Sequence, residues 1–312
     1  MGWKATDIPD LSGRVAVVTG GNRGLGFATS RKLAAHGATV VIGARNMARA
    51  EIACGAIGDE TPGARVEVRP IDLASLASVR SFAAGVLAEH PRVDLLFCNA
   101  GVMACPEGRT AEGFETQIGT NFYGHFALTM LLVPALIAAA DASPAGARVV
   151  CTTSMARFTA KNFDPEDLQL RGHYDPWAAY SNSKRAVLEF AIELERRLGG
   201  RGVHGFGADP GLSKTELQTT AAASMQSFQH RFWVRMMFLA QSAEKGALDQ
   251  LRAGTDPRAR GGVLYAPRWI SFGSPIVRRL TGPITSAPEH RALWQLAERE
   301  TGITLASVLP PR

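Results

Sequence analysis

The sequence predicts an α/β fold in which one doubly wound parallel sheet carries helices on both faces. Two observations support this prediction. Short runs rich in Val, Ile and Leu alternate with longer helical patterns, which is typical of β-α-β units. The first such run ends in glycines and leads directly into a helical pattern. The chain has 312 residues, 46% of them hydrophobic and 20% charged, which is enough to bury the core of one large domain.

Charge and cysteine usage restrict the classes of function. The formal charge is +6, but the basic residues are scattered and favour a solvated surface over a nucleic-acid-binding patch. None of the four cysteines forms a CxxC or has zinc-ligand spacing, which suits a reducing cytosol. We therefore expect no nucleic-acid partner, no metal site and a cytoplasmic location.

Membrane anchoring is not expected from the sequence. The N-terminus lacks the charged-then-apolar order of a signal peptide. The longest apolar stretch, 127–140, contains Pro134 and is shorter than the roughly 20 residues that a span needs.

The first predicted strand, 14–20, is followed by a glycine-rich loop and a helix that stops near Gly37. Gly20 permits a tight turn, and the later glycines remove side chains where the backbone must approach a pyrophosphate or pack on the strand. Backbone N–H groups and the helix dipole would then hold the phosphates. The predicted phosphate-binding residues are Gly20, Asn22, Arg23, Gly24, Leu25 and Gly26.

The second predicted strand, 38–44, ends at Arg45. In a fold of this type the tip of that strand meets the adenosine ribose, where a carboxylate suits NAD and an arginine suits the 2′-phosphate of NADP. Arg23 could reach the same phosphate. The two cations favour NADP(H), although two solvated surface arginines would give the same pattern.

The third and fourth predicted strands, 65–71 and 93–98, are followed by further candidate cofactor contacts. Asp72, next to Leu73, could accept from the adenine amino group or cap a helix that starts near Ser75. The fourth strand runs into small residues that would let a cofactor lie close over the sheet edge, namely Asn99, Ala100 and Gly101.

A long helix is predicted over roughly 112–140, and it carries Asn121 among apolar residues. Asparagine is a poor mid-helix residue, so this one is either a satisfied core group or functional. A fifth strand, 147–153, leads to Ser154, and we expect loop with short turns over 155–175.

Tyr180 and Lys184 lie four residues apart on a helix predicted over 176–198, and hence on one face. A free phenol has a pKa of about 10 and is a poor acid or base at neutral pH, but a nearby positive charge lowers that pKa. The pair is therefore a plausible proton-transfer device. An exposed helix face would show the same spacing by chance.

The remaining segments complete the sheet and a substrate side. A sixth strand, 202–208, leads into Pro210 and Gly211. Residues 212–240 carry a stripe of Met and aromatic residues that is core, a lid over an apolar substrate, or a peripheral membrane face. A helix near 243–252, a strand at 262–266 and a helix near 288–300 follow. We expect one domain, divided into a cofactor-binding and catalytic core, a lid, and a last strand with a C-terminal helix, at 14–211, 212–260 and 261–312.

In this order the motifs resemble those of the short-chain dehydrogenase/reductase family over essentially the whole chain. The matching pieces are Thr19-Gly20-x3-Gly24-x-Gly26, Asn99-Ala100-Gly101, Asn121, Ser154, Tyr180-x3-Lys184 and Pro210-Gly211. The chain looks most like the retinol dehydrogenase-like branch, on Trp177-Ala-Ala-Tyr180-Ser-Asn-Ser-Lys184, the long Ser-to-Tyr interval, Gly261-Gly-Val-Leu-Tyr265-Ala-Pro267 and Leu293-Trp294.

The resemblance implies a Rossmann-type sheet of about seven strands in the order 3-2-1-4-5-6-7. It also implies roles: Tyr180 as the acid/base, Lys184 lowering its pKa and binding the nicotinamide ribose, Ser154 holding the substrate oxygen, and Asn121 positioning a relay water. One departure is Ser213, where the family often has a branched apolar residue at a backbone contact to the cofactor carboxamide.

The leading hypothesis is thus an NADP(H)-dependent oxidoreductase acting on an apolar ketone, aldehyde or alcohol. The alternative is a cofactor-binding sensor or scaffold without turnover, because fold alone does not fix function. A lipid-surface contact through residues 228–238 is compatible with the first hypothesis. A homo-oligomer is possible within the family.

Overall fold

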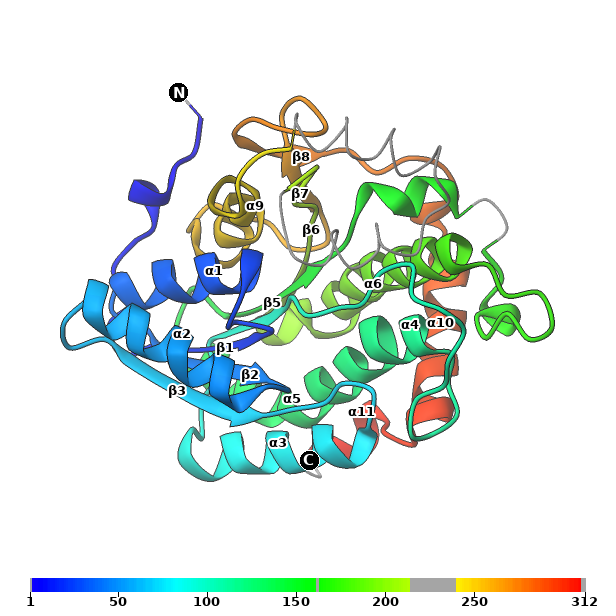
Figure 1. Ribbon diagram of the computed structural model, residues 1–312, viewed down its shortest axis with the longest axis horizontal. Coiled ribbons are helices and arrows are strands. Elements are labelled where there is room, and N and C mark those ends of the chain that lie inside the picture. Colours follow the sequence, from blue (N-terminus) through cyan, green and yellow to red (C-terminus); the bar gives the residue numbers. More distant parts are fainter. Residues whose placement is uncertain (1, 161–162, 214–239, 310–312) are drawn as a thin grey trace.

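The computed structural model describes residues 2–160, 163–213 and 240–309. Within them, one sheet runs in the order β3-β2-β1-β4-β5-β6-β7-β8, with helices on both faces (Figure 1). Strand pairs are parallel from β3 to β7, and β8 pairs antiparallel with β7. The predicted strand order is confirmed, and β8 adds an eighth strand at the edge.

The element bounds lie close to those predicted. The strands are β1 (Val15–Thr19), β2 (Thr39–Ala44), β3 (Arg65–Pro70), β4 (Leu95–Cys98), β5 (Ala147–Thr152), β6 (Val203–Ala208), β7 (Leu264–Pro267) and β8 (Pro275–Arg278). The α-helices are α1 (Gly24–Ala35), α2 (Met47–Glu60), α3 (Leu76–Glu89), α4 (Thr116–Ile118), α5 (Gly124–Ala142), α6 (Pro176–Leu198), α9 (Ala243–Thr255), α10 (Ala287–Thr301) and α11 (Leu305–Val308). Shorter turns are η1 (Ala5–Asp7), η2 (Gly119–Tyr123), η3 (Met155–Thr159), η4 (Pro165–Asp167), η5 (Gly199–Arg201) and η6 (Gly282–Thr285).

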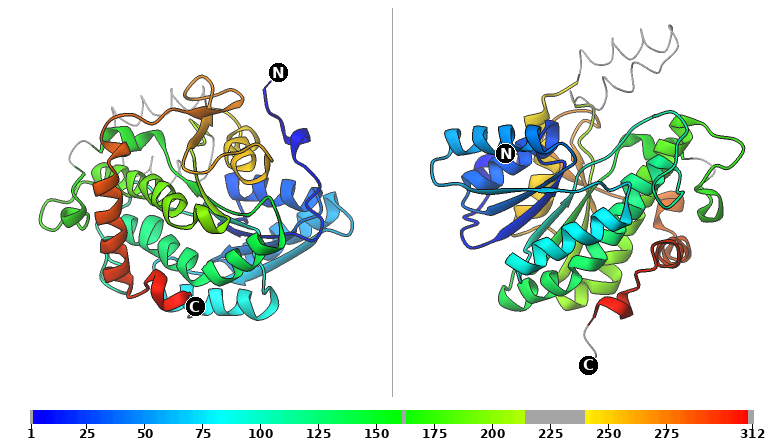
Figure 2. Two further views of the ribbon diagram at one scale, coloured as in Figure 1. Left: turned by 180° about the vertical axis from the view of Figure 1, so that it is seen from behind. Right: turned by 60° about the horizontal axis from the view of Figure 1, so that its bottom comes forward.

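Two apolar layers sandwich the sheet because successive side chains of a strand point to opposite faces. Val17 packs with α3, α5 and α6, whereas its neighbour Val18 packs with α1, α2 and α9. Figure 2 shows these two helical layers on either side of the sheet. Burial on both faces explains why the central strands read as continuous apolar runs.

The long central helix starts later than predicted, because Glu115 caps it. The Glu115 carboxylate accepts hydrogen bonds at 2.8 Å from the N–H groups of Gln117 and Ile118. The stretch Thr116–Ala142 is apolar and long enough to span a membrane, but 78% of its most apolar window is buried inside the protein. It is therefore a core helix of this fold.

The substrate side differs most from the prediction. The predicted lid, 212–260, includes α9, which instead packs on α1 and on β5, β6 and β7 as part of the core. The Met and aromatic stripe at 225–238 lies outside the described residues. Strand β8 was not predicted, because it has only four residues and begins with a proline.

Candidate functional site

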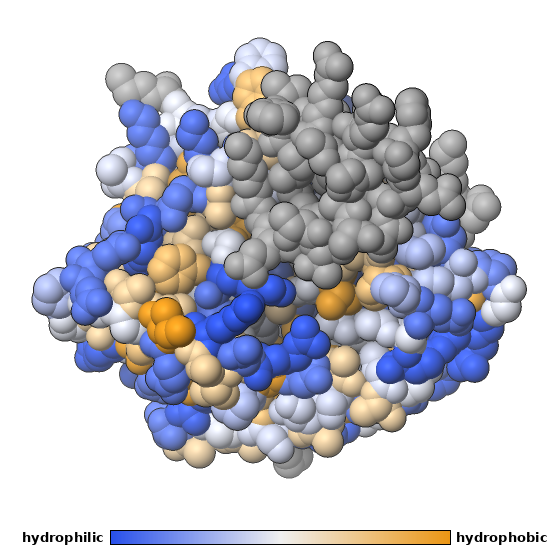
Figure 3. All heavy atoms as spheres, in the orientation of Figure 1, coloured by the Kyte–Doolittle hydropathy of each residue, from blue (hydrophilic) through white to orange (hydrophobic). Residues whose placement is uncertain are grey.

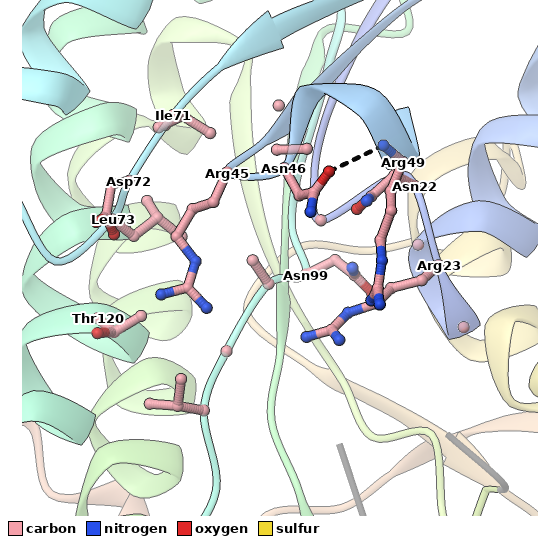
Figure 4. Close-up of a pocket in the computed structure, with 18 of the residues that line it drawn as sticks. Asn22, Arg23, Arg45, Asn46, Arg49, Ile71, Asp72, Leu73, Asn99 and Thr120 are labelled. Carbon is pink, nitrogen blue, oxygen red and sulfur yellow. Dashed lines mark hydrogen bonds between the residues drawn. The ribbon is translucent and has the colours of Figure 1, made fainter. Parts of the chain in front are cut away.

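A pocket of about 430 Å³ lies at the carboxyl ends of β1, β2 and β4 (Figure 4). Its volume is in the range of ligand sites, and its position is where open α/β sheets bind ligands. Twelve residues predicted from the sequence line it: Gly20, Asn22, Arg23, Gly24, Leu25, Gly26, Arg45, Asp72, Leu73, Asn99, Ala100 and Gly101. Seven others complete it: Gly43, Ala44, Asn46, Arg49, Ile71, Val102 and Thr120.

The glycine loop has the geometry that a phosphate cradle requires. A Cβ on Gly26 would lie 2.1 Å from the carbonyl oxygen of Gly20, so no side chain fits there. Gly20 has φ +65°, a left-handed conformation that favours glycine. Helix α1 begins at Gly24, and its N-terminal N–H groups have no partner within the helix. These residues therefore fit the pyrophosphate of a dinucleotide.

Three arginines extend into the pocket from the loop after β1 and from the β2–α2 junction (Figure 4). Arg23 and Arg45 were predicted, and Arg49 was missed. Arg49 lies one turn into α2, where Asn46 caps the helix by accepting at 2.9 Å from the Arg49 N–H. The four-residue spacing from Arg45 to Arg49 was the available signal. Hydrophilic side chains accordingly gather near the middle of the face shown in Figure 3.

Asp72 lines the pocket, but it does not cap α3. Its carboxylate accepts at 3.0 Å from the Ala74 N–H in the turn before the helix. The capping residue is Ser75, which accepts from the Ser78 N–H. The capping alternative for Asp72 is therefore wrong, because the helix begins four residues further on.

The Thr19 hydroxyl joins the ends of β1 and β4 beneath the pocket. It accepts at 3.0 Å from the N–H groups of both Asn99 and Ala100. It also lies 2.9 Å from Nε2 of His125, whose Nδ1 lies 2.8 Å from the main-chain oxygen of Asn121. Burial lowers the pKa of His125 to about 4, so this histidine is neutral at physiological pH. Sequence reasoning assigned no role to His125.

Asn121 lies in a π-helical turn, η2, between α4 and α5. Its side-chain amide accepts from the Val102 N–H at 2.8 Å and donates to the Val102 oxygen at 3.0 Å and to the Ser183 hydroxyl at 2.9 Å. A π-turn is rare and frequent at functional sites. Asn121 therefore ties the loop after β4 to α6, the helix that carries Tyr180.

Tyr180 and Lys184 lie on one face of α6, both buried, with exposed fractions of 5% and 4%. The Lys184 ammonium donates at 2.9 Å to the Thr152 oxygen and lies 5.9 Å from the centre of the Tyr180 ring. A Cβ on Gly101 would lie 3.5 Å from Lys184 Nζ, so the ammonium adjoins the pocket at that glycine. The exposed-face alternative is therefore wrong.

The pKa of Tyr180 differs from the prediction. Burial raises it to about 12, and a hydrogen bond with Ser154 only partly offsets this. The expected net lowering of the Tyr180 pKa is therefore wrong, since desolvation of the phenolate dominates. Burial also lowers the pKa of Lys184, to about 8.

The turn after β6 brings Pro210, Gly211 and Ser213 to the same edge of the sheet. Gly211 has φ +60°, and a Cβ there would lie 2.7 Å from the Ser271 oxygen, which explains the glycine. Ser213 is buried, and its hydroxyl donates at 2.7 Å to the Pro210 oxygen. Ser213, which stands where the family often has a branched apolar residue, thus stabilises this turn through a hydrogen bond within it.

Comparisons with known proteins agree with this architecture. The family model described as short chain dehydrogenase matches residues 14–226. A polyprenol dehydrogenase of Mus musculus is 41% identical over 256 residues, which cover 81% of this chain and 75% of that protein. Retinol dehydrogenase 12 of Homo sapiens is 42% identical over 207 residues, which cover 66% of this chain and 64% of that protein. A crystal structure of an uncharacterised protein from Mycobacterium paratuberculosis, 36% identical, superposes with a TM-score of 0.78 over 98% of this chain and 99% of that chain.

Proposed function

Because the chain belongs to the short-chain dehydrogenase/reductase family, in its retinol dehydrogenase-like branch, we propose that it is an NADP(H)-dependent oxidoreductase. It interconverts a carbonyl compound and an alcohol on a largely apolar substrate. The observation that carries the proposal is the hydrogen-bonded Ser154–Tyr180 pair beside Lys184, at the edge of the glycine-lined pocket. The two named relatives act, by their names, on polyprenol and on retinol, which supports an apolar alcohol or carbonyl.

The proton chemistry of the site favours reduction of a carbonyl. With a pKa of about 12, Tyr180 carries its proton at neutral pH and can donate it to a carbonyl oxygen. The Ser154 hydroxyl holds the same oxygen, and the Lys184 ammonium stabilises the phenolate that remains. Asn121 keeps the loop after β4 packed on α6. The bound nicotinamide supplies the hydride in reduction and accepts it in oxidation.

The arginines support NADP(H) over NAD(H). Arg45 and Arg49 lie where the adenosine ribose binds in this fold, and Arg23 faces the same space (Figure 4). Guanidinium groups bind phosphate with a geometry that a lysine or an amide does not match. These three arginines would therefore select NADP(H), the dinucleotide that carries a 2′-phosphate.

Turnover with a carbonyl panel tests this proposal. The purified protein should oxidise NADPH faster than NADH with at least one group of aldehydes, ketones or polycyclic quinones. Tyr180→Phe should lower the rate by roughly 10²- to 10⁴-fold, the usual contribution of a general acid, while NADPH binding persists. Tyr265→Phe is the matched control, because it removes another buried phenol that lies beside Arg260. Tight NADPH binding without turnover would instead support a non-catalytic sensor.

A further inference from the structure

A buried ion pair joins two loops that no sequence motif connects. Arg157 lies in η3, three residues after Ser154, and Asp209 directly follows β6. Their side chains are 4% and 2% exposed, and they are in direct contact. Pairs buried to this degree lose much of their hydration, so they are weak evidence for a role in stability alone.

The pair forms a continuous hydrogen-bonded link between the two loops. The Arg157 Nη1 donates to the Asp209 carboxylate and, at 2.6 Å, to the main-chain oxygen of Ser154. The other oxygen of Asp209 accepts at 3.0 Å from the Gly211 N–H. The guanidinium is also held over the Phe158 ring, 4.3 Å from its centre. The link therefore runs from the backbone of Ser154 to the backbone of Gly211.

We propose that Arg157 and Asp209 are positioning residues that hold the Ser154 turn and the Pro210–Gly211 turn at a fixed separation. This inference rests on the function proposed above, in which Ser154 holds the substrate oxygen. It also rests on the resemblance to the family, which implies that the turn after Pro210 contacts the cofactor near its carboxamide. Hydride transfer needs both reactants in a defined geometry, and small displacements are costly in rate. The link fixes that geometry before either ligand binds.

Asp209 also affects the acid/base residues electrostatically. Burial is the first cause of the raised pKa of Tyr180, and the Asp209 charge raises it further. Asp209 opposes the burial effect at Lys184, and it adds to the burial effect that raises the pKa of Asp249 on α9. Ionisable and polar groups from every neighbouring element surround Asp209 and the acid/base residues. They are Arg157 and Ser154 from the β5–η3 turn, Tyr180 and Lys184 from α6, Cys151 from β5, Asp249 and Arg252 from α9, and Arg278 from β8.

Two variants of the full chain test the link: Asp209→Asn and Arg157→Met. Hydrogen exchange of the ligand-free protein should become about tenfold faster at amides of 153–158 and of 211–213 in both variants, because each loses the shared contact. Asp256→Asn is the matched control, since Asp256 is 2% exposed and paired with Arg252 and Arg258 beyond the C-terminal end of α9. Exchange in the two turns should stay at its wild-type rate in that control.

Kinetics give a second readout. Both variants should lower kcat/KM for carbonyl reduction by roughly 10- to 100-fold. Removing the Asp209 charge should shift the alkaline limb assigned to Lys184 to lower pH, because that charge raises the pKa of Lys184. Removing Arg157 leaves the Asp209 charge unpaired and should shift the same limb to higher pH. Simple loosening of the fold would not move the two limbs in opposite directions. Arg157→Lys keeps the charge but not the forked geometry, so it should retain part of the rate, including where Arg157→Met fails to fold.

Wild-type exchange in both turns of Asp209→Asn and Arg157→Met would overturn the link, as would equal acceleration in Asp256→Asn. Unchanged kcat/KM and pH limbs in folded variants would overturn the positioning role. Faster exchange in both turns together with a wild-type protein that turns over no carbonyl would leave the link in place and refute the proposed function instead.

Discussion

The two halves of the proposed site, the adenosine half and the catalytic half, differ in their contact with water. At the adenosine half, Arg23, Arg45 and Arg49 are exposed on the rim of an open pocket. At the catalytic half, Asn121, Tyr180 and Lys184 are 1%, 5% and 4% exposed. Water and salt weaken the interactions of exposed charges, whereas buried groups shift one another's pKa values and share hydrogen bonds. Substitutions should therefore have mild effects in the adenosine half and strong effects in the catalytic half.

Among the substitutions that test this comparison, the largest effect on catalysis is expected at Lys184. Lys184→Met removes a buried ammonium beside Tyr180, and we expect kcat/KM for reduction to fall by roughly 10³-fold, within the range of general acid–base contributions. The pKa of Lys184 is lowered by burial to about 8, so its charge is present below that pH and lost above it. Wild-type kcat/KM for reduction should therefore decline as pH rises through about 8. Steady-state rates across pH 6 to about 10 measure both effects.

Two outcomes would contradict this expectation. One is a Lys184→Met variant that keeps its rate, and the other is an alkaline limb near pH 8 that persists in it. NADPH binding by the variant, measured by fluorescence, separates loss of chemistry from loss of the cofactor site. Lys245→Met, which removes a lysine near the start of α9, is the control.

The same contrast explains what the sequence could predict. The strands, the glycine turn and the Tyr180–Lys184 pair could be predicted from local patterns, because each shows as an apolar run, a strand end or a helix spacing in the chain. The strand order and the proposed roles of Asn121 and Ser154 came from the resemblance to the family. Arg157 and Asp209 could not be paired in advance, since 52 residues separate them and only the β5–β6 contact brings them together. The sign of the Tyr180 pKa shift was mispredicted for a related reason: spacing reveals a neighbouring charge but not the depth of burial.

A second expected effect concerns the buried His125, which tests whether the catalytic half behaves as one unit. Its pKa is lowered by burial from 6.5 to about 4, so the folded state binds the proton less well than the unfolded chain. Keeping His125 neutral therefore contributes on the order of 3 kcal/mol to the free energy of unfolding above pH 6.5, and this contribution is lost as the pH falls to about 4. His125→Gln should flatten this acid slope of the free energy of unfolding, which urea titrations at several pH values measure.

The test of His125 compares the pH slope of the free energy of unfolding in wild type with the slope in His125→Gln. Glu189 has a pKa raised by burial to about 7, and it contributes a slope of the opposite sign, but it does so in wild type and variant alike. An unchanged slope in His125→Gln would show that the histidine is not buried as a neutral group. A lowered kcat accompanying the flattened slope would show that the Thr19–His125–Asn121 contacts support the reaction as well as the fold.

The smallest effects are expected at the adenosine half. Arg45→Ala and Arg49→Ala should each weaken NADPH binding about tenfold, since a hydrogen bond to a charged group contributes roughly 1.5–3 kcal/mol and exposure reduces it. NADH binding should change little, because it lacks the 2′-phosphate. The double variant should lose less than the sum of the two free energies, because both arginines would bind the same phosphate. Equal loss for NADH and NADPH would mean that these arginines do not bind the ribose phosphate. A loss far above tenfold in either single variant would mean that the two halves of the proposed site are not as different as their exposure indicates.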